Sequence, residues 1–188
     1  MSKKIVVELN RKSIQNAIKQ LKSIKNIYQN QMMFEYLQRT ADWIINRANE
    51  ILDRSDIGED VKGAIFDAWN TEWTSEHSLV IRNYSRKAVY VEFGVGIIGQ
   101  TSQHPNADAT NYEYNVDSEA KFGQGYWQFS VRNDEELDIP QEAITYRQGQ
   151  TIITQGTEGV WYLYNAVEDF KLREQERLWK ELTRKYLG

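Results

Sequence analysis

The chain has 188 residues, 40% of them hydrophobic and 27% charged, which is the size and composition of one ordinary globular domain. It contains no cysteine, so disulfides, thiolate metal sites and thiol nucleophiles are excluded. A net charge of -4 and a pI near 5.3 argue against a general nucleic-acid-binding protein, whose domains are usually basic. The chain shows no signal-peptide core and no run long enough to span a bilayer, so we expect a protein made in soluble form without a membrane partner.

Charge is distributed unevenly along the chain. Residues 1–30 carry seven cations against Glu8, whereas residues 50–76 carry eight acids against Arg54 and Lys62. These runs are typical of solvated helix faces. They also fit a second interpretation, in which oppositely charged surfaces of neighbouring subunits meet.

The N-terminal part of the chain predicts helices. Residues 5–9 are β-branched and short, as in an edge strand. Apolar residues then recur at spacings of three and four, first over 14–28 and again over 32–52. Because only residues 26–31 interrupt this pattern, the sequence allows either two helices or one long bent helix over about 10–52.

The middle of the chain predicts an antiparallel sheet of four to five strands. An acidic loop with one helical turn is expected at residues 53–76, and a hydrophobic period of two begins after it. The expected strands are residues 79–84, 88–93, 126–132, 143–147 and 151–154, all within about 79–155, and the last two are expected to pair as a hairpin around residues 148–150. Helical spacing returns over about 160–186, so the predicted fold is α+β, with the sheet packed against long N-terminal and C-terminal helices in one domain over 1–188.

Residues 94–99 read GVGIIG and match the GxGxxG string of dinucleotide-binding folds. That fingerprint needs a helix opening after the glycines and a parallel βαβ unit, and the sequence predicts neither, because residues 99–125 read as a long irregular connection. The glycines are better explained by unusual backbone angles or a close backbone approach where the chain leaves the sheet.

Candidate catalytic groups are few. His77 and His104 lack the spacing of metal ligands, and His104 is expected to be a hydrogen-bonding residue at the surface. Glu92 lies in an apolar run and needs a partner if it is buried, for which an arginine of the same sheet or of another subunit is expected. A glycosidase-like acid pair stays open, because such pairs are defined by their separation in space.

Residues 88–96 read AVYVEFGVG and resemble the A-x-Y-V-E-F-G-T-G string of a phage neck or tail-completion protein family. Further matches follow in the order of that family and extend the resemblance over roughly residues 79–170. They are His104-Pro105, then residues 114–117, 125–127, 154–156 and 161–166. The chain departs from the family at Val95, where threonine is common, and at the acidic stretch 133–141, which reads as an enlarged hairpin loop.

The resemblance implies a structural virion protein of a long-tailed bacteriophage that is not an enzyme and has no cofactor, catalytic residue or metal ligand. It implies a structural motif that shapes the assembly surfaces. Its residues are Tyr90, Val91, Glu92, Phe93, Gly94, Gly96, His104, Pro105, Trp127 and Gly156.

Such a protein would form a ring of its own copies in the neck, the connector that joins the head to the tail. Its partners would be portal, adaptor or head-closure proteins and tail-tube or terminator proteins, with DNA passing through the lumen without specific binding. Acids facing that lumen would repel DNA phosphates. We expect it in the virion, and in the host cytoplasm during assembly.

Two alternatives stay open. The first is a tail-terminator ring, which occupies a different place in the same joint. The second is a small carbohydrate-active enzyme, in which tryptophan and tyrosine side chains stack on sugars and a carboxylate pair acts. The positions of the aromatic side chains separate the two classes, because sugar platforms are exposed in a cleft while core and interface aromatics are covered.

Overall fold

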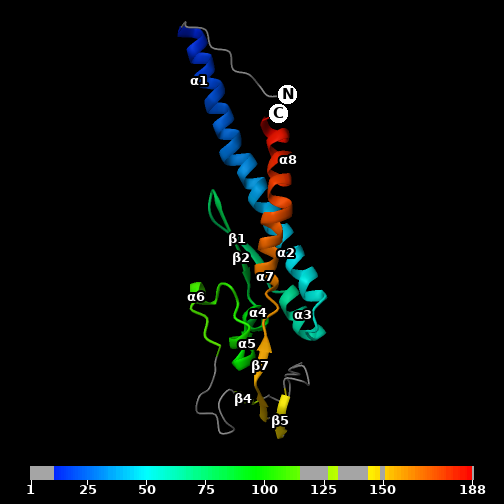
Figure 1. Ribbon diagram of the computed structural model, residues 1–188. Coiled ribbons are helices and arrows are strands. Elements are labelled where there is room, and N and C mark those ends of the chain that lie inside the picture. Colours follow the sequence, from blue (N-terminus) through cyan, green and yellow to red (C-terminus); the bar gives the residue numbers. More distant parts are fainter. Residues whose placement is uncertain (1–10, 115–126, 131–143, 149–150, 188) are drawn as a thin grey trace. The chain divides into compact units, whose positions relative to one another are not determined.

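The computed structural model describes residues 11–114, 127–130, 144–148 and 151–187 (Figure 1). These residues form two compact units, each made of segments that are distant in the sequence. Unit 1 comprises Met1–Ile44, Thr71–Arg82 and Val167–Gly188, and unit 2 comprises Ile45–Asn70 and Asn83–Ala166. In the described ranges no helix is both long and apolar enough to cross a bilayer.

The predicted N-terminal helices are confirmed. Helix α1 (Arg11–Asn26) continues through the π-helical segment η1 (Ile27–Met32) into α2 (Met33–Asp53). The π-helical segment lies where residues 26–31 interrupt the apolar pattern, because its wider turn realigns the two apolar rows. The outcome is the second of the two expected forms, one long helical run with a local irregularity.

The core of unit 1 forms where the C-terminal helices pack on this run. Helix α7 (Tyr162–Asp169) passes through η3 (Phe170–Glu174) into α8 (Gln175–Leu187), which confirms the predicted C-terminal helix. Figure 1 shows α8 beside the end of α1 and the start of α2. The buried apolar residues of this unit include Met32, Ala41, Ile44, Phe170, Leu178 and Leu182.

Aromatic pairs extend that core toward the surface. The ring of Trp179 makes edge contacts with Tyr28 at 6.1 Å and with Tyr36 at 5.4 Å between centroids. Trp43 packs on Phe170 at 5.6 Å. Edge contacts of this kind favour aromatic pairs beyond the area they bury, so they add to the attachment of the C-terminal helices.

The prediction of an acidic loop at residues 53–76 is partly wrong. The expected helical turn is present as α3 (Glu59–Phe66), but the following residues form strand β1 (Trp69–Ser75). This strand pairs with β2 (Ser78–Asn83) in a two-stranded sheet. Side chains of β1 alternate between half-buried and exposed, which is the period of two that a half-covered strand requires.

The predicted strand at residues 88–93 is wrong, because these residues form helix α4 (Arg86–Phe93). The Ser85 hydroxyl accepts a hydrogen bond from the backbone N–H of Lys87 and caps the helix start. The buried side chains are Ala88, Val91 and Glu92, a helical spacing rather than an alternating one. Capping and packing therefore override the strand propensity of this valine- and aromatic-rich segment.

The prediction of one sheet of four to five strands is also wrong, and the fold is rich in helix. The described strands fall into three small sheets, with orders β1-β2, β3-β7 and β4-β6-β5. Since α4 replaces a central strand, no continuous ladder can join the strands before it to those after it. The helices consequently do not cover one common sheet.

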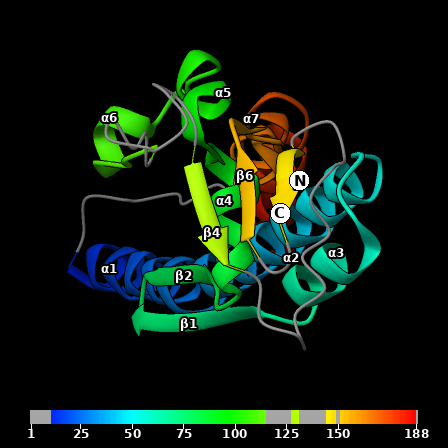
Figure 2. The ribbon, with the colours of Figure 1, turned by 90° about the horizontal axis from the view of Figure 1, so that it is seen from below.

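The third sheet keeps the hairpin that the sequence predicts. Strand β6 (Thr151–Thr154) lies between β4 (Trp127–Ser130) and β5 (Ile144–Gln148), and both pairings are antiparallel (Figure 2). Trp127 of β4 is in register with Thr154. The expected strand at residues 5–9 and the enlarged loop at 133–141 lie outside the described residues.

The connection expected to be irregular from residue 99 holds short helices. Strand β3 (Gly94–Val95) leads directly into α5 (Gly96–Thr101), and α6 (Ala107–Thr110) follows. Strand β3 pairs antiparallel with β7 (Gly156–Glu158). The expectation that no helix opens at these glycines is therefore wrong. The remaining argument against nucleotide binding is the antiparallel pairing of β3 with β7, since the dinucleotide fold needs a parallel βαβ unit.

Candidate functional site

The most highly connected polar group of unit 2 is the carboxylate of Glu92, near the end of α4. The residue is 6% exposed. Its Oε2 accepts the backbone N–H of Leu163 at 2.8 Å, and its Oε1 accepts the backbone N–H of Tyr164 at 2.9 Å. These N–H groups belong to the first turn of α7, where they have no acceptor within the helix and where negative charge is favourable. Glu92 therefore caps α7 from a segment about seventy residues away.

Backbone hydrogen bonds join the same two segments, with donors just before α7 and acceptors at the end of α4. The carbonyl oxygens of Val91 and Glu92, at the end of α4, accept the N–H groups of Val160 at 2.7 Å and Trp161 at 3.2 Å. The end of one helix and the start of another thus satisfy each other's free backbone groups. We call this arrangement the Glu92 clamp: Val91 and Glu92 bound to residues 160–164.

His104 is the third member of the site, and its predicted surface position is wrong. It is 4% exposed, and its Nε2 lies 3.0 Å from Oε1 of Glu92. Its Nδ1 accepts the backbone N–H of Asn106, so the ring hydrogen is on Nε2 and is donated to Glu92. The partner of Glu92 is therefore a neutral imidazole and two backbone amides, and the expectation of an arginine is wrong.

Aromatic rings surround this imidazole. The ring centroid of His104 lies 4.3 Å from that of Phe93, 5.3 Å from that of Tyr164 and 5.9 Å from that of Trp161. The backbone N–H of His104 donates to the hydroxyl of Tyr114 at 2.8 Å. Because these neighbours exclude water, the hydrogen bond between the imidazole and Glu92 is stronger than an exposed one.

Glycines allow two backbones to touch beside this site. Gly96 and Gly156 face each other in an antiparallel bridge, with φ angles of 67° and 97°. A Cβ atom added at Gly156 would overlap the carbonyl oxygen of Val95, and one added at Gly96 would overlap that of Gln155. The predicted roles of the glycines, an unusual backbone angle and a close approach, are confirmed at these positions.

The structure brings most of the predicted motif residues together but leaves some outside. Glu92, Phe93 and His104 are in direct contact, and Gly94 accepts a hydrogen bond from Tyr112 at 2.6 Å through its carbonyl oxygen. Val91 is buried, whereas Tyr90 and Pro105 are exposed, and Trp127 lies in β4 opposite Thr154.

Sequence reasoning missed three residues of the site. Tyr112 stacks on Phe93 at 4.5 Å, and burial raises the pKa of its hydroxyl to about 12. Trp161 has a φ of 54°, and its buried Nε1 has no hydrogen-bond partner in the described ranges. Burial also raises the pKa of the Tyr162 hydroxyl, which lies 3.4 Å from the carbonyl oxygen of Ala88. Their only signal in the sequence is the density of aromatic residues at 112–114 and 161–164.

The geometry of the site is suited to holding structure. Both oxygens of Glu92 and both ring nitrogens of His104 are engaged by protein groups, and both residues are buried. A general acid or base must reach a substrate proton, which these atoms do not. Among the described residues no three acidic or imidazole side chains are grouped so as to hold a metal ion.

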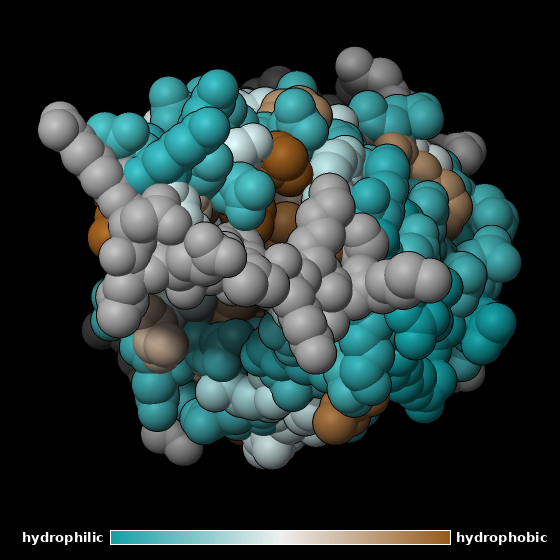
Figure 3. Space-filling view, turned by 90° about the horizontal axis from the view of Figure 1, so that it is seen from above, coloured by the Kyte–Doolittle hydropathy of each residue, from teal (hydrophilic) through white to brown (hydrophobic). Residues whose placement is uncertain are grey.

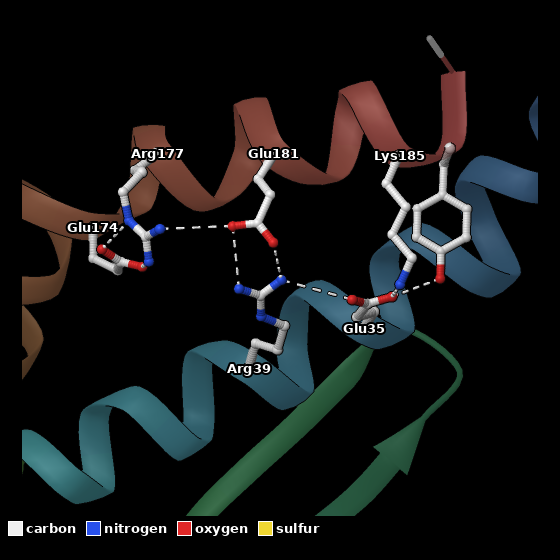
Figure 4. Close-up of polar contacts among 7 residues, drawn as sticks. Glu35, Arg39, Glu174, Arg177, Glu181 and Lys185 are labelled. Carbon is white, nitrogen blue, oxygen red and sulfur yellow. Dashed lines mark hydrogen bonds and ion pairs between the residues drawn. The ribbon is translucent and has the colours of Figure 1, made fainter.

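A different polar cluster joins α2 to α8 in unit 1 (Figure 4). The carboxylate of Glu35 lies 2.6 Å from the Nζ of Lys185, 2.6 Å from the hydroxyl of Tyr186 and 3.7 Å from the guanidinium of Arg39. Hydrogen bonds from Lys185 and Tyr186 lower the pKa of Glu35. The same bond to Glu35 raises the pKa of Lys185.

The cluster continues along α8 with alternating sign. Arg39 donates to both oxygens of Glu181, at 2.6 and 3.3 Å, and this bond lowers the pKa of Glu181. Arg177 lies 3.6 Å from Glu181 and also donates to Glu174. We call the set from Glu35 to Glu174 the α2–α8 charge ladder. It fastens two helices of unit 1 at the surface.

One exposed tryptophan of the described residues lies beside a hollow that lacks the carboxylate pair expected of a carbohydrate-active enzyme. Trp179, 36% exposed, borders a surface hollow of about 360 Å³ lined also by Tyr36, Lys171, Gln175 and Glu176. Glu176 is the one carboxylate in this lining, and it is ion-paired with Lys180 at 2.5 Å. Glycoside hydrolysis needs two carboxylates flanking the bond, so this hollow does not provide the required pair.

Comparison with protein-family models, with curated proteins and with solved structures finds no match for this chain. The resemblance of residues 88–96 to phage neck proteins therefore stays a prediction.

Proposed function

We propose that the protein is a structural subunit of the head-tail connector of a long-tailed bacteriophage, where copies of it form a ring. The observation that carries the proposal is the Glu92 clamp. Glu92, Phe93, Gly94, Gly96, His104 and Gly156 follow one another in the order of the phage motif, and all of them take part in one buried internal scaffold. Residues that carry chemistry would instead be expected to converge on an open cleft.

The outer side of the same helix supports an assembly role. While α4 buries Val91 and Glu92, it exposes Val89 at 48% and Tyr90 at 45%, and Tyr84 just before it is 67% exposed. Exposed aromatic residues on a rigid element are typical anchors of protein interfaces. The clamp stiffens this helix from the inside, and the aromatic patch of Tyr84, Val89 and Tyr90 provides the contact surface.

Deletion of the gene from the phage genome that carries it tests the proposal. We expect lysates with DNA-filled heads and separate tails, because the connector that joins them is missing. Addition of the purified protein should restore joined, infectious particles, counted by electron microscopy and plaque assay. Joined particles in the deletion lysate would overturn the proposal, whatever the protein does in isolation.

A double variant separates the contact surface from the fold. Tyr84→Ser with Tyr90→Ser removes two exposed rings and should restore joining at least about tenfold less well than the unchanged protein, since interface anchors of this kind dominate binding. Leu172→Ser is the matched control, because Leu172 is 80% exposed and lies in η3 of unit 1. Equal restoration by both variants would exclude the aromatic patch as an assembly surface.

The tail-terminator ring stays a candidate of the same class. In the deletion lysate that function predicts tails of uncontrolled length, whereas the neck function predicts tails of normal length. Measurement of tail lengths in the same micrographs decides between them.

A further inference from the structure

The outer half of α1 carries large apolar side chains that are partly exposed, although Ala17 between them is buried. On the face that continues into the core, the exposed fraction of the residues rises from 0% at Met32 to 37% at Tyr28 and 56% at Leu21. It is 48% at Ile18 and 42% at Ile14. Figure 3 shows the molecule from the end where α1 begins and α8 ends, with hydrophobic atoms in separate patches on a mainly hydrophilic surface. A contiguous row of large apolar side chains on one helix face marks an interaction surface.

The charges around this row indicate an acidic partner. Helix α1 contains no acidic residue, and the lysines Lys12, Lys19, Lys22 and Lys25 make no ion pair within the described residues. A second α1 would bring cations against cations, which is unfavourable. Lys25 lies four positions after Leu21 and seven after Ile18, within the apolar row itself. A cation in that position fits a carboxylate on a protein surface better than the hydrocarbon of a membrane.

Exposed carboxylates of the opposite charge lie in one stretch of the same chain. The carboxylates of Asp53, Asp56 and Asp67 are exposed and make no ion pair within the described residues. Half-buried Ile57 and Phe66 lie between these acids in the sequence and provide apolar area. We call residues 50–67 the acidic segment.

In the proposed connector ring, every copy carries both of these surfaces, with α1 at the start of a helical run and Asp53 at its end. The surface that α1 meets in such a ring is the acidic segment of the next copy. A surface that meets a different surface on the next copy produces a ring or an open chain of subunits.

We propose that the apolar face of α1, with Lys22 and Lys25, docks on the acidic segment of the adjacent copy. This inference rests on the proposed connector function and names the contact that would build its ring. Opposite charges steer the two surfaces together, and burial of Ile14, Ile18 and Leu21 then holds them.

Two charge-reversed variants test the contact. Variant A carries Lys22→Glu and Lys25→Glu, and variant B carries Asp53→Lys and Asp56→Lys. Each variant alone should be at least about tenfold weaker in self-association than the unchanged chain, because it brings like charges together. Native mass spectrometry and sedimentation velocity at low salt measure the association.

Mixing the two variants gives the sharpest outcome. The unchanged α1 of B can dock on the unchanged acidic segment of A, and the reversed α1 of A can dock on the reversed segment of B. We therefore expect mixed assemblies in which A and B alternate, while each variant alone stays dissociated. A single chain carrying all four substitutions should self-associate again, because both surfaces have exchanged charge.

The matched control lies on the same helix. Lys12→Glu with Lys19→Glu makes an equal charge change on the side of α1 opposite the apolar row, and this variant should assemble as the unchanged chain does. Equal loss in this control and in variant A would overturn the proposed contact. So would binding of the unchanged chain to anionic phospholipid vesicles without any self-association.

The result also separates this inference from the connector function. If variant A still joins heads to tails in the complementation experiment, the α1 contact is wrong and the connector function stands. If deletion of the gene leaves joined particles, the connector function is wrong even when A and B form their mixed assembly.

Discussion

Two glutamates of this protein are held by several donors each, in very different surroundings. Glu92 is 6% exposed and is bound by two helix N–H groups and a neutral imidazole in unit 2. Glu35 belongs to the charge ladder of unit 1, where its side chain is 24% exposed and its partners are long, solvated side chains. Removal of Glu92 would leave buried donors unpaired, whereas water can replace Glu35. The comparison teaches that burial, more than the number of bonds, decides what a carboxylate contributes.

The largest effect is expected beside the clamp, at Gly156. Gly156→Ala combines a φ of 97° with overlap on the carbonyl oxygen of Val95. The strain and the overlap together should cost about 4 kcal/mol of unfolding free energy, measured by urea denaturation. Gly63→Ala is the control, because no atom lies within 4 Å of its added Cβ, and it should stabilise α3 by about 1 kcal/mol. If Gly156→Ala were as stable as Gly63→Ala, the close approach of β3 and β7 would contribute nothing to the unfolding free energy.

The second effect is expected at Glu92 itself. Glu92→Ala leaves two amides and the imidazole N–H without an acceptor and should destabilise the protein by about 3 kcal/mol. Hydrogen exchange at Leu163 and Tyr164 is the local readout, and it should accelerate at least about a hundredfold for that loss. Glu158→Ala, an exposed glutamate that accepts from Ser102, should leave exchange in α7 unchanged. Unchanged exchange in Glu92→Ala would show that the carboxylate does not cap α7.

A smaller effect is expected in the charge ladder. Arg39→Met removes the central cation between Glu35 and Glu181 and should cost at most about 1 kcal/mol, because the site is exposed. The difference from the unchanged protein should shrink in 1 M salt, where charges are screened within about 3 Å. A salt-independent difference would indicate that the packing of the side chain, and not its charge, is what matters.

The smallest effect is expected from pH. The pKa values of Glu35 and Glu181 are lowered from 4.5 by hydrogen bonds from Lys185 and from Arg39, respectively. Their contribution to stability is therefore complete above pH 4.5 and is lost as the pH falls through the lowered pKa values. At basic pH the sign is opposite, because the pKa of Lys185 is raised from 10.5. The stability that protonated Lys185 contributes is complete below pH 10.5 and is lost as the pH rises through the raised pKa. Thermal melts of unchanged and Arg39→Met protein should converge as the pH falls through the lowered pKa values; parallel curves would contradict this.

The sequence predicts what depends on local periodicity. Long rows of apolar residues at spacings of three and four correctly indicate α1, α2 and α8, and the turn at residues 148–150 correctly indicates the hairpin of β5 and β6. The sequence is misleading at residues 88–93, where valines and aromatic residues favour a strand but the chain forms α4. There the signal for a helix is the single residue Ser85, whose capping role becomes visible only together with the burial of Val91 and Glu92.

The site depends on contacts that periodicity does not encode. The three partners of Glu92 lie 12, 71 and 72 residues further along the chain, in segments whose approach depends on the whole of unit 2. A buried acid signals that a partner exists but not which one, so an imidazole and helix amides took the place of the expected arginine. The glycines were predictable because a close approach of two backbones tolerates no other residue type.

The Glu92 clamp also joins two points of the backbone that are distant in the sequence. The chain leaves after Glu92 and returns at Val160, and the hydrogen bonds of the clamp hold these two points together, as at the base of an omega loop. Extra length within the excursion changes neither its point of departure nor its point of return. The fold can therefore accept insertions between these two points without moving the helices on either side.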